Sequence, residues 1–240
     1  MYRVGLPLFP LNLVLFPDAP LPLHIFEERY RDMVRECLES DRSFGVILVN
    51  QDATNQDTAR IHSIGTIAHI VDTRPYPDGR YDIMCLGRER FQVESHQNDR
   101  SYHTASVTIL NETGARSGRL DPADTSATSG AIATKTIVEL RSLLATLISA
   151  TTTDEIRTEQ LRRIAQAIPS EPIALSYFAA RILPTANVAD RQELLEIPDA
   201  STRLLKVQEH LKRERLVANQ LEEISKNSVA KGDGVGHVFN

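Results

Sequence analysis

Five histidines lie on or beside expected β-strands and are the residues most able to do chemistry: His24, His62, His69, His96 and His103. Imidazole serves as a general base near neutral pH, so histidines that converge beside a serine or cysteine can form a hydrolase site. Their spacing matches neither H-E-x-x-H nor another paired metal-ligand motif. Scattered histidines are more often surface groups or satisfied core groups. The sequence therefore predicts no catalytic residues and no metal site, with a small histidine-dependent hydrolase as an alternative.

Loops that hold phosphates are missing from the sequence. None of the five lysines follows a glycine, so the phosphate-binding G-x-x-x-x-G-K-[ST] loop is absent. The glycines at 232–236 resemble a dinucleotide loop, but the third is misplaced and no strand precedes them. Residues 114–118 miss the G-x-S-x-G nucleophile elbow by one position. We therefore expect no cofactor and no ATP binding.

The two cysteines, Cys37 and Cys85, are far apart in sequence and match no metal-ligand spacing. Small apolar side chains of this kind are commonly buried, and a reducing compartment keeps them as thiols. We predict two buried, unpaired thiols.

The charge balance is acidic, with a net charge of −5. Residues 1–110 hold eleven Arg, no Lys and fifteen acids. Binding to a phosphate backbone usually requires a basic face, so we expect no nucleic-acid partner. RNA binding stays open as an alternative, because a local Arg patch is compatible with this balance.

The stretch from Val4 to Phe26 has Asp18 as its only charged residue, which raises the question of a membrane span or signal peptide. Five prolines interrupt it: Pro7, Pro10, Pro17, Pro20 and Pro22. Each would remove a helical hydrogen bond, so no long apolar helix forms there. We expect a cytoplasmic protein without a membrane partner.

The first half of the sequence alternates short runs of β-forming residues with Gly and Pro. The expected strands are 4–8, 13–16, 21–25, 44–50, 64–73, 80–86, 90–95 and 102–110. Residues 76–79 (YPDG) are typical of a turn. One helix is expected at 27–39, where apolar residues recur at helical spacing. Many short strands with such turns predict a small barrel.

The second half has helical periodicity. A stripe of Ile and Leu begins at Ile137, and further helices are expected before Pro169, from Pro172 to Pro184, at 188–196 and at 202–226. A Gly-, Ser- and Thr-rich stretch separates the two halves. The predicted boundaries are a β-barrel domain at 1–112, a linker at 113–130, a helical bundle domain at 131–227 and a disordered tail at 228–240.

Several segments resemble one known family in their residues and order. They are 6–11 (LPLFPL), 14–17 (VLFP), 21–30 (LPLHIFEERY), 44–46 (FGV), 64–66 (IGT), 78–80 (DGR), 87–91 (GRERF), 191–196 (RQELLE) and 203–205 (RLL). The opening and the L-x-I-F-E-x-R-Y signature resemble the amino-terminal substrate-binding domain of Lon proteases. The resemblance covers most of residues 4–215.

The resemblance implies an α+β fold: a PUA-like small β-barrel with one inserted helix, followed by an α-helical bundle that ends in a long helix. Within the signature, Ile25, Phe26 and Tyr30 span a strand end and the first helical turn, so we expect them to fasten the helix to the barrel. Glu27 and Arg29 are expected to form caps or a buried pair.

The resemblance also implies a stand-alone, non-catalytic module that binds unfolded or damaged polypeptides, or an adaptor in protein quality control with a separate protease or chaperone. The family's ATPase and Ser–Lys protease modules have no counterpart in the sequence. Apolar surface in a groove between barrel and bundle is the expected binding site. The sequence predicts neither the contact residues nor the oligomeric state.

Overall fold

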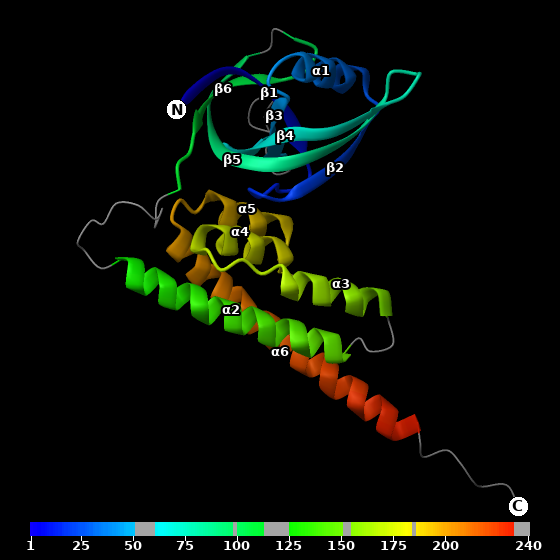
Figure 1. Cartoon of the computed structure of the whole chain (residues 1–240), viewed down its shortest axis with the longest axis vertical. Helices are drawn as coiled ribbons and strands as arrows, with labels where there is room; N and C mark the ends of the chain where they lie inside the picture. Colours follow the sequence, from blue (N-terminus) through cyan, green and yellow to red (C-terminus); the bar gives the residue numbers. More distant parts are fainter. Residues whose placement is uncertain (51–60, 98–99, 113–124, 151–154, 184–185, 233–240) are drawn as a thin grey trace, which may run out of the picture. The chain divides into compact units, whose positions relative to one another are not determined.

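The computed structural model describes residues 1–50, 61–97, 100–112, 125–150, 155–183 and 186–232 (Figure 1). By its internal contacts the chain divides into two compact units. Unit 1 comprises Met1–Thr113 and Ala186–Ala200, and unit 2 comprises Gly114–Thr185 and Ser201–Asn240.

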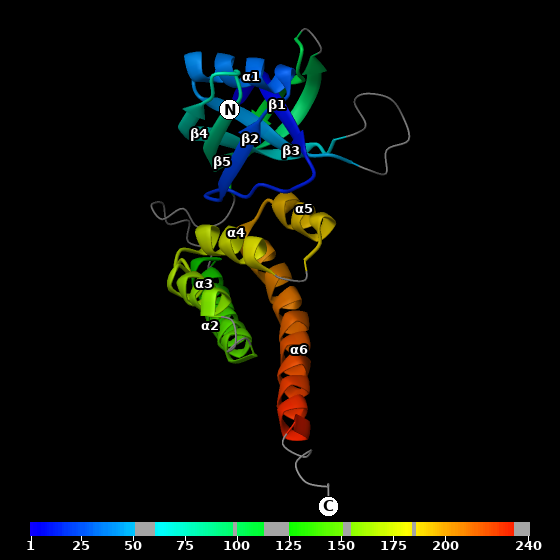
Figure 2. The same ribbon diagram turned by 90° about the vertical axis from the view of Figure 1, so that its right-hand side faces the viewer.

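Unit 1 is a six-stranded mixed sheet with one long inserted helix. Its elements are β1 (Tyr2–Leu11), β2 (Pro20–Ile25), α1 (Glu28–Glu39), β3 (Ser43–Leu48), β4 (Ile64–Pro75), β5 (Tyr81–Gln97) and β6 (Thr104–Ile109), joined by α5 (Val188–Glu196). The strand order is β2-β5-β4-β3-β1-β6, and β6 pairs with β5 as well as β1. Five strands therefore close into a ring in the order β5-β4-β3-β1-β6. Strand β2 pairs with β5 outside this ring, and α1 lies across one end of it (Figures 1 and 2).

The interior of the ring is apolar and tightly packed around Phe91, which is fully buried with Leu6, Leu8, Ile47 and Val107. Two glycines of the family-like segments make room for its ring. A Cβ on Gly45 would lie 2.7 Å from Phe91 Cζ, and a Cβ on Gly65 would lie 2.7 Å from the same atom. Interiors this dense do not absorb an extra methyl group without shifts, so these segments specify core packing.

Arg90 joins α5 to the ring from inside unit 1. This side chain is 1% exposed, and its Nη1 donates to the main-chain oxygens of Leu195 at 2.6 Å and Ile197 at 3.0 Å. Its Nη2 lies 2.7 Å from Glu112 Oε1. The last carbonyls of a helix lack intrahelical donors and carry partial negative charge, so a guanidinium satisfies both needs. Arg90 therefore fixes a segment distant in sequence against β5.

Unit 2 is helical. It contains α2 (Thr125–Ala150), α3 (Glu155–Gln166), α4 (Pro172–Ile182) and α6 (Ala200–Gly232, whose first residue is assigned to unit 1). Its core includes the buried side chains of Leu140, Leu175 and Leu204. Arg203 is also fully buried; its Nη1 donates to Ser176 Oγ at 2.8 Å. Buried polar groups need such partners, so this contact also orients α6 against α4.

The α+β class predicted from the sequence is confirmed, with three differences in detail. Residues 13–16 form no strand, although Leu15 and Phe16 are buried. The two strands expected at 80–86 and 90–95 are one continuous strand, β5, because β4, β2 and β6 pair along its length. Helix α6 continues to Gly232, beyond the residue where the tail was expected to begin.

The predicted domain boundaries differ from the observed units in one segment. Residues 186–200 were expected in the bundle, and their contacts place them with the strands of unit 1. Helix α2 begins at Thr125, inside the expected linker. The rest of that linker to residue 124, and the tail from 233, lie outside the described residues. The boundaries themselves stay a prediction.

Candidate functional site

The signature around residue 26 has both buried and exposed members. Ile25 is 2% exposed and Tyr30 is 7% exposed, and the Tyr30 ring contacts Phe9 edge-on with centroids 4.2 Å apart. Phe26 is 63% exposed. It follows the last residue of β2 and precedes α1, so its side chain leaves the core. The expectation that Phe26 fastens the helix to the barrel was therefore wrong, whereas Ile25 and Tyr30 are packed as expected.

Glu27 and Arg29 form an ion pair, but it is exposed and not buried. Arg29 Nη2 lies 2.8 Å from Glu27 Oε2. Glu27 occupies the N-cap position of α1 without a side-chain capping bond. Arg29 is in turn held over the Tyr30 ring, 4.6 Å from its centroid. The pair therefore borders Phe26 at the surface, where ion pairs contribute little to stability.

An outward face of β2 and β5 continues from Phe26. We name it the β2–β5 face and define it by Pro22, His24, Phe26, Tyr76, Asp82 and Met84. Pro22 is paired with Met84, and His24 with Asp82, across the two strands. Because side chains alternate along a strand, these positions share one face, while Leu21 and Ile83 point into the core. Pro22, His24 and Met84 are exposed, so the face offers apolar and aromatic groups to solvent.

A short hydrogen-bonded cluster holds the rings of this face. The Asp82 carboxylate accepts from Tyr76 OH at 2.5 Å and lies 2.6 Å from His24 Nδ1. The hydrogen bond from Tyr76, and to a smaller extent the one with His24, holds the pKa of Asp82 below its ordinary value. The same hydrogen bond to Asp82 raises the pKa of Tyr76. The His24 and Phe26 rings are stacked with centroids 6.2 Å apart. The aromatic groups are therefore positioned before any ligand arrives.

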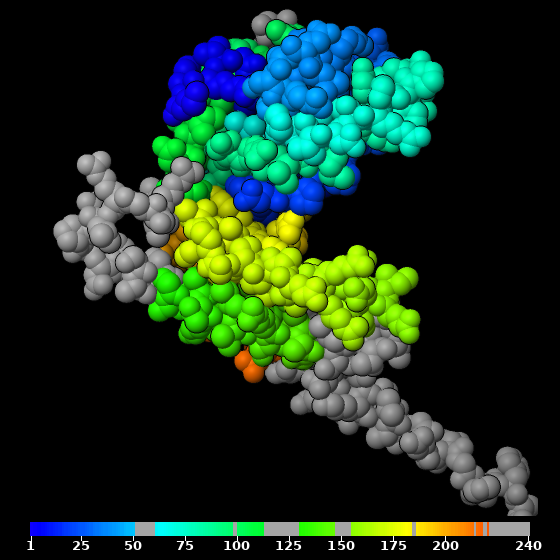
Figure 3. Space-filling view, in the orientation of Figure 1, coloured from blue at the N-terminus to red at the C-terminus, as the bar shows by residue number. Residues whose placement is uncertain are grey.

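The turn that carries Tyr76 projects from the surface of unit 1, between β4 and β5 (Figure 3). It matches the YPDG turn predicted from the sequence. Gly79 has φ +82°, a conformation that favours glycine, and its N–H donates to the main-chain oxygen of Tyr76 at 3.0 Å. Arg74 and Arg80 lie over the Tyr76 ring, at 5.6 and 5.5 Å from its centroid. The sequence signals for this face were the period of two in β2 and β5 and the turn.

The strand histidines have separate partners. His62 Nδ1 lies 3.3 Å from Glu196 Oε1, and His69 Nδ1 lies 3.1 Å from Ser43 Oγ. The Ser43 hydroxyl also lies 3.1 Å from the main-chain oxygen of Asp41, a second acceptor to which it can donate. The pKa of His96 is lowered by burial and by His103. His24, His62 and His69 therefore contact three different partners (Asp82, Glu196 and Ser43) and do not converge on one side chain.

The thiols of Cys37 and Cys85 are both free and buried, as predicted. Burial raises the pKa of each to about 12, so both are protonated at neutral pH. Within the described ranges, no group of three His, Cys, Asp or Glu side chains could hold a metal ion. No helix in the described part of the chain combines the length and apolar character needed to cross a membrane.

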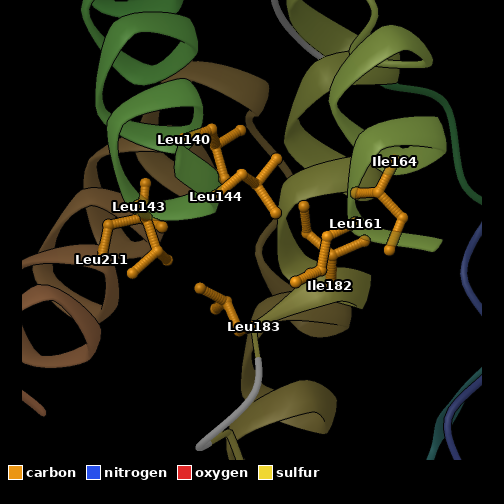
Figure 4. A pocket seen from close by; sticks show the side chains of 8 residues that line it. All are labelled: Leu140, Leu143, Leu144, Leu161, Ile164, Ile182, Leu183 and Leu211. Carbon is orange, nitrogen blue, oxygen red and sulfur yellow. The ribbon is translucent and has the colours of Figure 1, made fainter. Parts of the chain in front are cut away.

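Unit 2 contains an apolar cavity of about 40 Å³ (Figure 4). Aliphatic side chains from α2, α3, α4 and α6, and Leu183 after α4, line it: Leu140, Leu143, Leu144, Leu161, Ile164, Ile182, Leu183 and Leu211. An apolar cavity offers water no hydrogen-bond partners. Most of its lining residues are buried, so it is a gap in the bundle packing and not a surface for a polypeptide.

Two solved structures share the fold of the chain. A Lon N-terminal domain protein from Xanthomonas campestris aligns with a TM-score of 0.55 at 24% identity, over 86% of this chain and 98% of that chain. The N-terminal domain of a Mycobacterium avium complex Lon protease aligns with a TM-score of 0.58 at 17% identity, over 87% and 98%. The ring of strands with its helical unit is therefore the fold of a Lon N-terminal domain.

The family assignment follows from the sequence itself. Residues 5–213 match the family model described as the ATP-dependent protease La (LON) substrate-binding domain. The chain belongs to this family, which confirms the resemblance drawn from the signature segments.

The relatives are longer proteins. Lon protease of Cytophaga hutchinsonii is 28% identical over 204 residues, which cover 82% of this chain and 23% of the relative. Lon protease 1 of Bdellovibrio bacteriovorus is 29% identical over 228 residues, which cover 90% and 26%. The chain thus spans about a quarter of the length of these curated relatives.

Proposed function

We propose that the chain binds unfolded or damaged polypeptides through the β2–β5 face. The observation that carries the proposal is the 63% exposure of Phe26, an aromatic side chain that lies between the buried Ile25 and Tyr30 in the sequence. Exposed apolar groups that gather on one face mark partner sites more often than scattered ones do. Met84, across the strand pair from Pro22, adds a flexible side chain of the kind used at surfaces that accept many sequences.

The energetics of this face suit weak, unspecific capture. Covering Phe26 and Met84 contributes at most roughly 1.5–3 kcal/mol each. The cost of association offsets much of this sum, so we expect dissociation constants in the micromolar range or above. The bonds from Asp82 to Tyr76 and His24 reduce the entropy lost on binding, because the rings are already ordered. Such a site can sample many chains and release them.

The chain is further proposed to act without chemistry of its own, as a substrate-binding module or adaptor that serves a separate protease or chaperone. The match of residues 5–213 to a substrate-binding domain supports this role. The groove expected between the two parts of the chain stays a prediction, and the β2–β5 face lies within unit 1 alone.

The test compares Phe26→Gln and Met84→Gln with a matched control, Tyr2→Gln. Tyr2 lies in unit 1 and is 59% exposed, but it is outside the β2–β5 face. The assay is suppression of aggregation of a heat-denatured model protein without ATP, at low and high salt. We expect both face variants to lose suppression, the control to keep it, and high salt to leave it intact, because apolar contacts are not screened.

Equal loss in the control, or suppression by the unmodified chain that moderate salt abolishes, would contradict the apolar mechanism. Absence of suppression at several-fold molar excess would contradict polypeptide binding itself.

A further inference from the structure

A polar cavity of about 290 Å³ lies in unit 1, beside α1 and the first half of β1. Its lining comes from β1, α1, the start of β3 and the segments before β3 and β6: Arg3, Gly5, Pro7, Glu36, Cys37, Ser40, Asp41, Ser43, Arg100 and Tyr102. No residue of the β2–β5 face is among them. Its volume is just below the range of about 300–1,000 Å³ typical of sites for drug-sized molecules, so a smaller molecule suits it.

A bulge in β1 accompanies this cavity. The pairing of β1 with β6 shifts register between Arg3 and Leu6. Gly5 lies in the bulge with φ +68°, and a Cβ placed on it would meet no atom within 4 Å. Glycine is therefore required by the backbone conformation and not by crowding. Bulges interrupt strand pairing and are common beside binding sites.

Two guanidinium–carboxylate pairs line the cavity. Arg3 Nη1 lies 2.8 Å from Asp41 Oδ2, and Arg100 is paired with Glu36. Tyr102 OH donates to Glu36 Oε2 at 2.8 Å and accepts from Arg100 Nη1 at 2.8 Å. The side chains of both pairs are partly exposed, so water and solutes reach them. A guanidinium has five N–H donors, and its bonds to one carboxylate do not use all of them, so some can bind a ligand.

We propose that this cavity binds a free α-amino acid. Each guanidinium lies beside a carboxylate, so the lining is balanced in charge. A simple anion would face Asp41 and Glu36 at close range, and a simple cation would face Arg3 and Arg100. A zwitterion satisfies both, because its carboxylate takes guanidinium N–H groups while its ammonium takes a carboxylate.

The test is a two-dimensional NMR titration of the ¹⁵N-labelled 240-residue chain with each of the twenty amino acids, and separately with acetate, methylammonium and inorganic phosphate. We expect at least one amino acid to shift the amide signals of Gly5, Ser40 and Tyr102 in a saturable way. Arg3→Met and Asp41→Asn should each weaken that binding at least tenfold. Arg35→Met is the control, since Arg35 pairs with Asp32 on α1 outside the cavity; it should leave the affinity unchanged.

A spectrum that is unperturbed outside the cavity shows that a variant is folded. If Arg3→Met does not fold, Asp41→Asn tests the proposal in its place. No saturable shift with any amino acid would overturn the proposal. Saturation by acetate or phosphate at the same amides would overturn it in favour of a simple anion site. Aggregation suppression reports on the β2–β5 face, so failure here and failure of the proposed function are distinguishable.

Discussion

Replacement of Arg90 by Met should release α5 from the strand ring and destabilise unit 1. Arg90 is 1% exposed and bonds to Glu112 and to the main-chain oxygens of Leu195 and Ile197. Met retains much of the volume but none of the donors, so the main-chain oxygens of Leu195 and Ile197 lose their hydrogen bonds to Arg90. Removal of one member of a buried ion pair costs about 3–5 kcal/mol. We expect a loss of that size in the free energy of unfolding of unit 1.

The assay is urea denaturation followed by tyrosine fluorescence. The chain has no Trp, and five of its six Tyr residues (all but Tyr177) lie in unit 1, so the signal reports mainly on that unit. Hydrogen exchange of the amides in 188–196 should rise more than exchange in the ring, because α5 loses its attachment first. Arg88→Met is the control: Arg88 is exposed on the same strand, and its replacement should cost less than about 0.5 kcal/mol.

A double variant separates the ion pair from the carbonyl contacts. In the Arg90→Met background, Glu112→Gln removes the negative charge that Arg90 no longer neutralises. The double variant should therefore lose less free energy of unfolding than the sum of the losses in the two single variants. A loss below about 1 kcal/mol for Arg90→Met, or unchanged protection of α5, would refute the reasoning that Arg90 holds the segment.

Three further predictions follow from the same contacts. Gly65→Ala should destabilise unit 1 by roughly 1–3 kcal/mol, because its Cβ would lie 2.4 Å from the main-chain oxygen of Val46. Gly130→Ala is the control and should not destabilise the chain, because no atom lies within 4 Å of the added Cβ; the midpoints of urea denaturation test both. The pKa of the Asp82 carboxyl is lowered in the folded chain, so its hydrogen bonds to Tyr76 and His24 are fully present above the ordinary value of 3.8 and are lost as the pH falls through the lowered pKa. A carboxyl ¹³C titration should therefore give a midpoint below 3.8, and Tyr76→Phe should move that midpoint upward. Isothermal titration with Mg-ATP should give no heat of binding, since no lysine follows a glycine-rich loop; a micromolar dissociation constant, about −8 kcal/mol, would contradict this.

Much of the local structure was legible in the sequence because its causes are local. The period of two in β2 and the helical spacing of 28–39 each depend on a few neighbouring residues. Pro172 begins α4 for the same reason, because its fixed φ suits the first turn of a helix. The family-like segments were also legible, and the structure explains them: Gly45, Gly65 and Phe91 are parts of one packing unit.

The exposure of Phe26 could not be predicted, because its neighbours Ile25 and Tyr30 are buried and its own type favours the core. Which side of a strand end faces the interior depends on where the chain turns into the next element. The sequence signature therefore identified the segment. Which of its side chains is exposed depends on the direction in which the chain leaves β2.

The sequence by itself determined the class, the family resemblance and most helices and strands, because propensity, turn chemistry and periodicity act over a few residues. Only the tertiary structure decided that β6 pairs with β1 to close the ring, that 186–200 belongs to unit 1, and that Arg3 and Arg100 line one cavity. These arrangements join residues about a hundred positions apart, as Arg90 and Leu195 show. Such contacts form where buried faces and unpaired hydrogen-bonding groups of distant segments complement one another, and no local pattern records that complementarity.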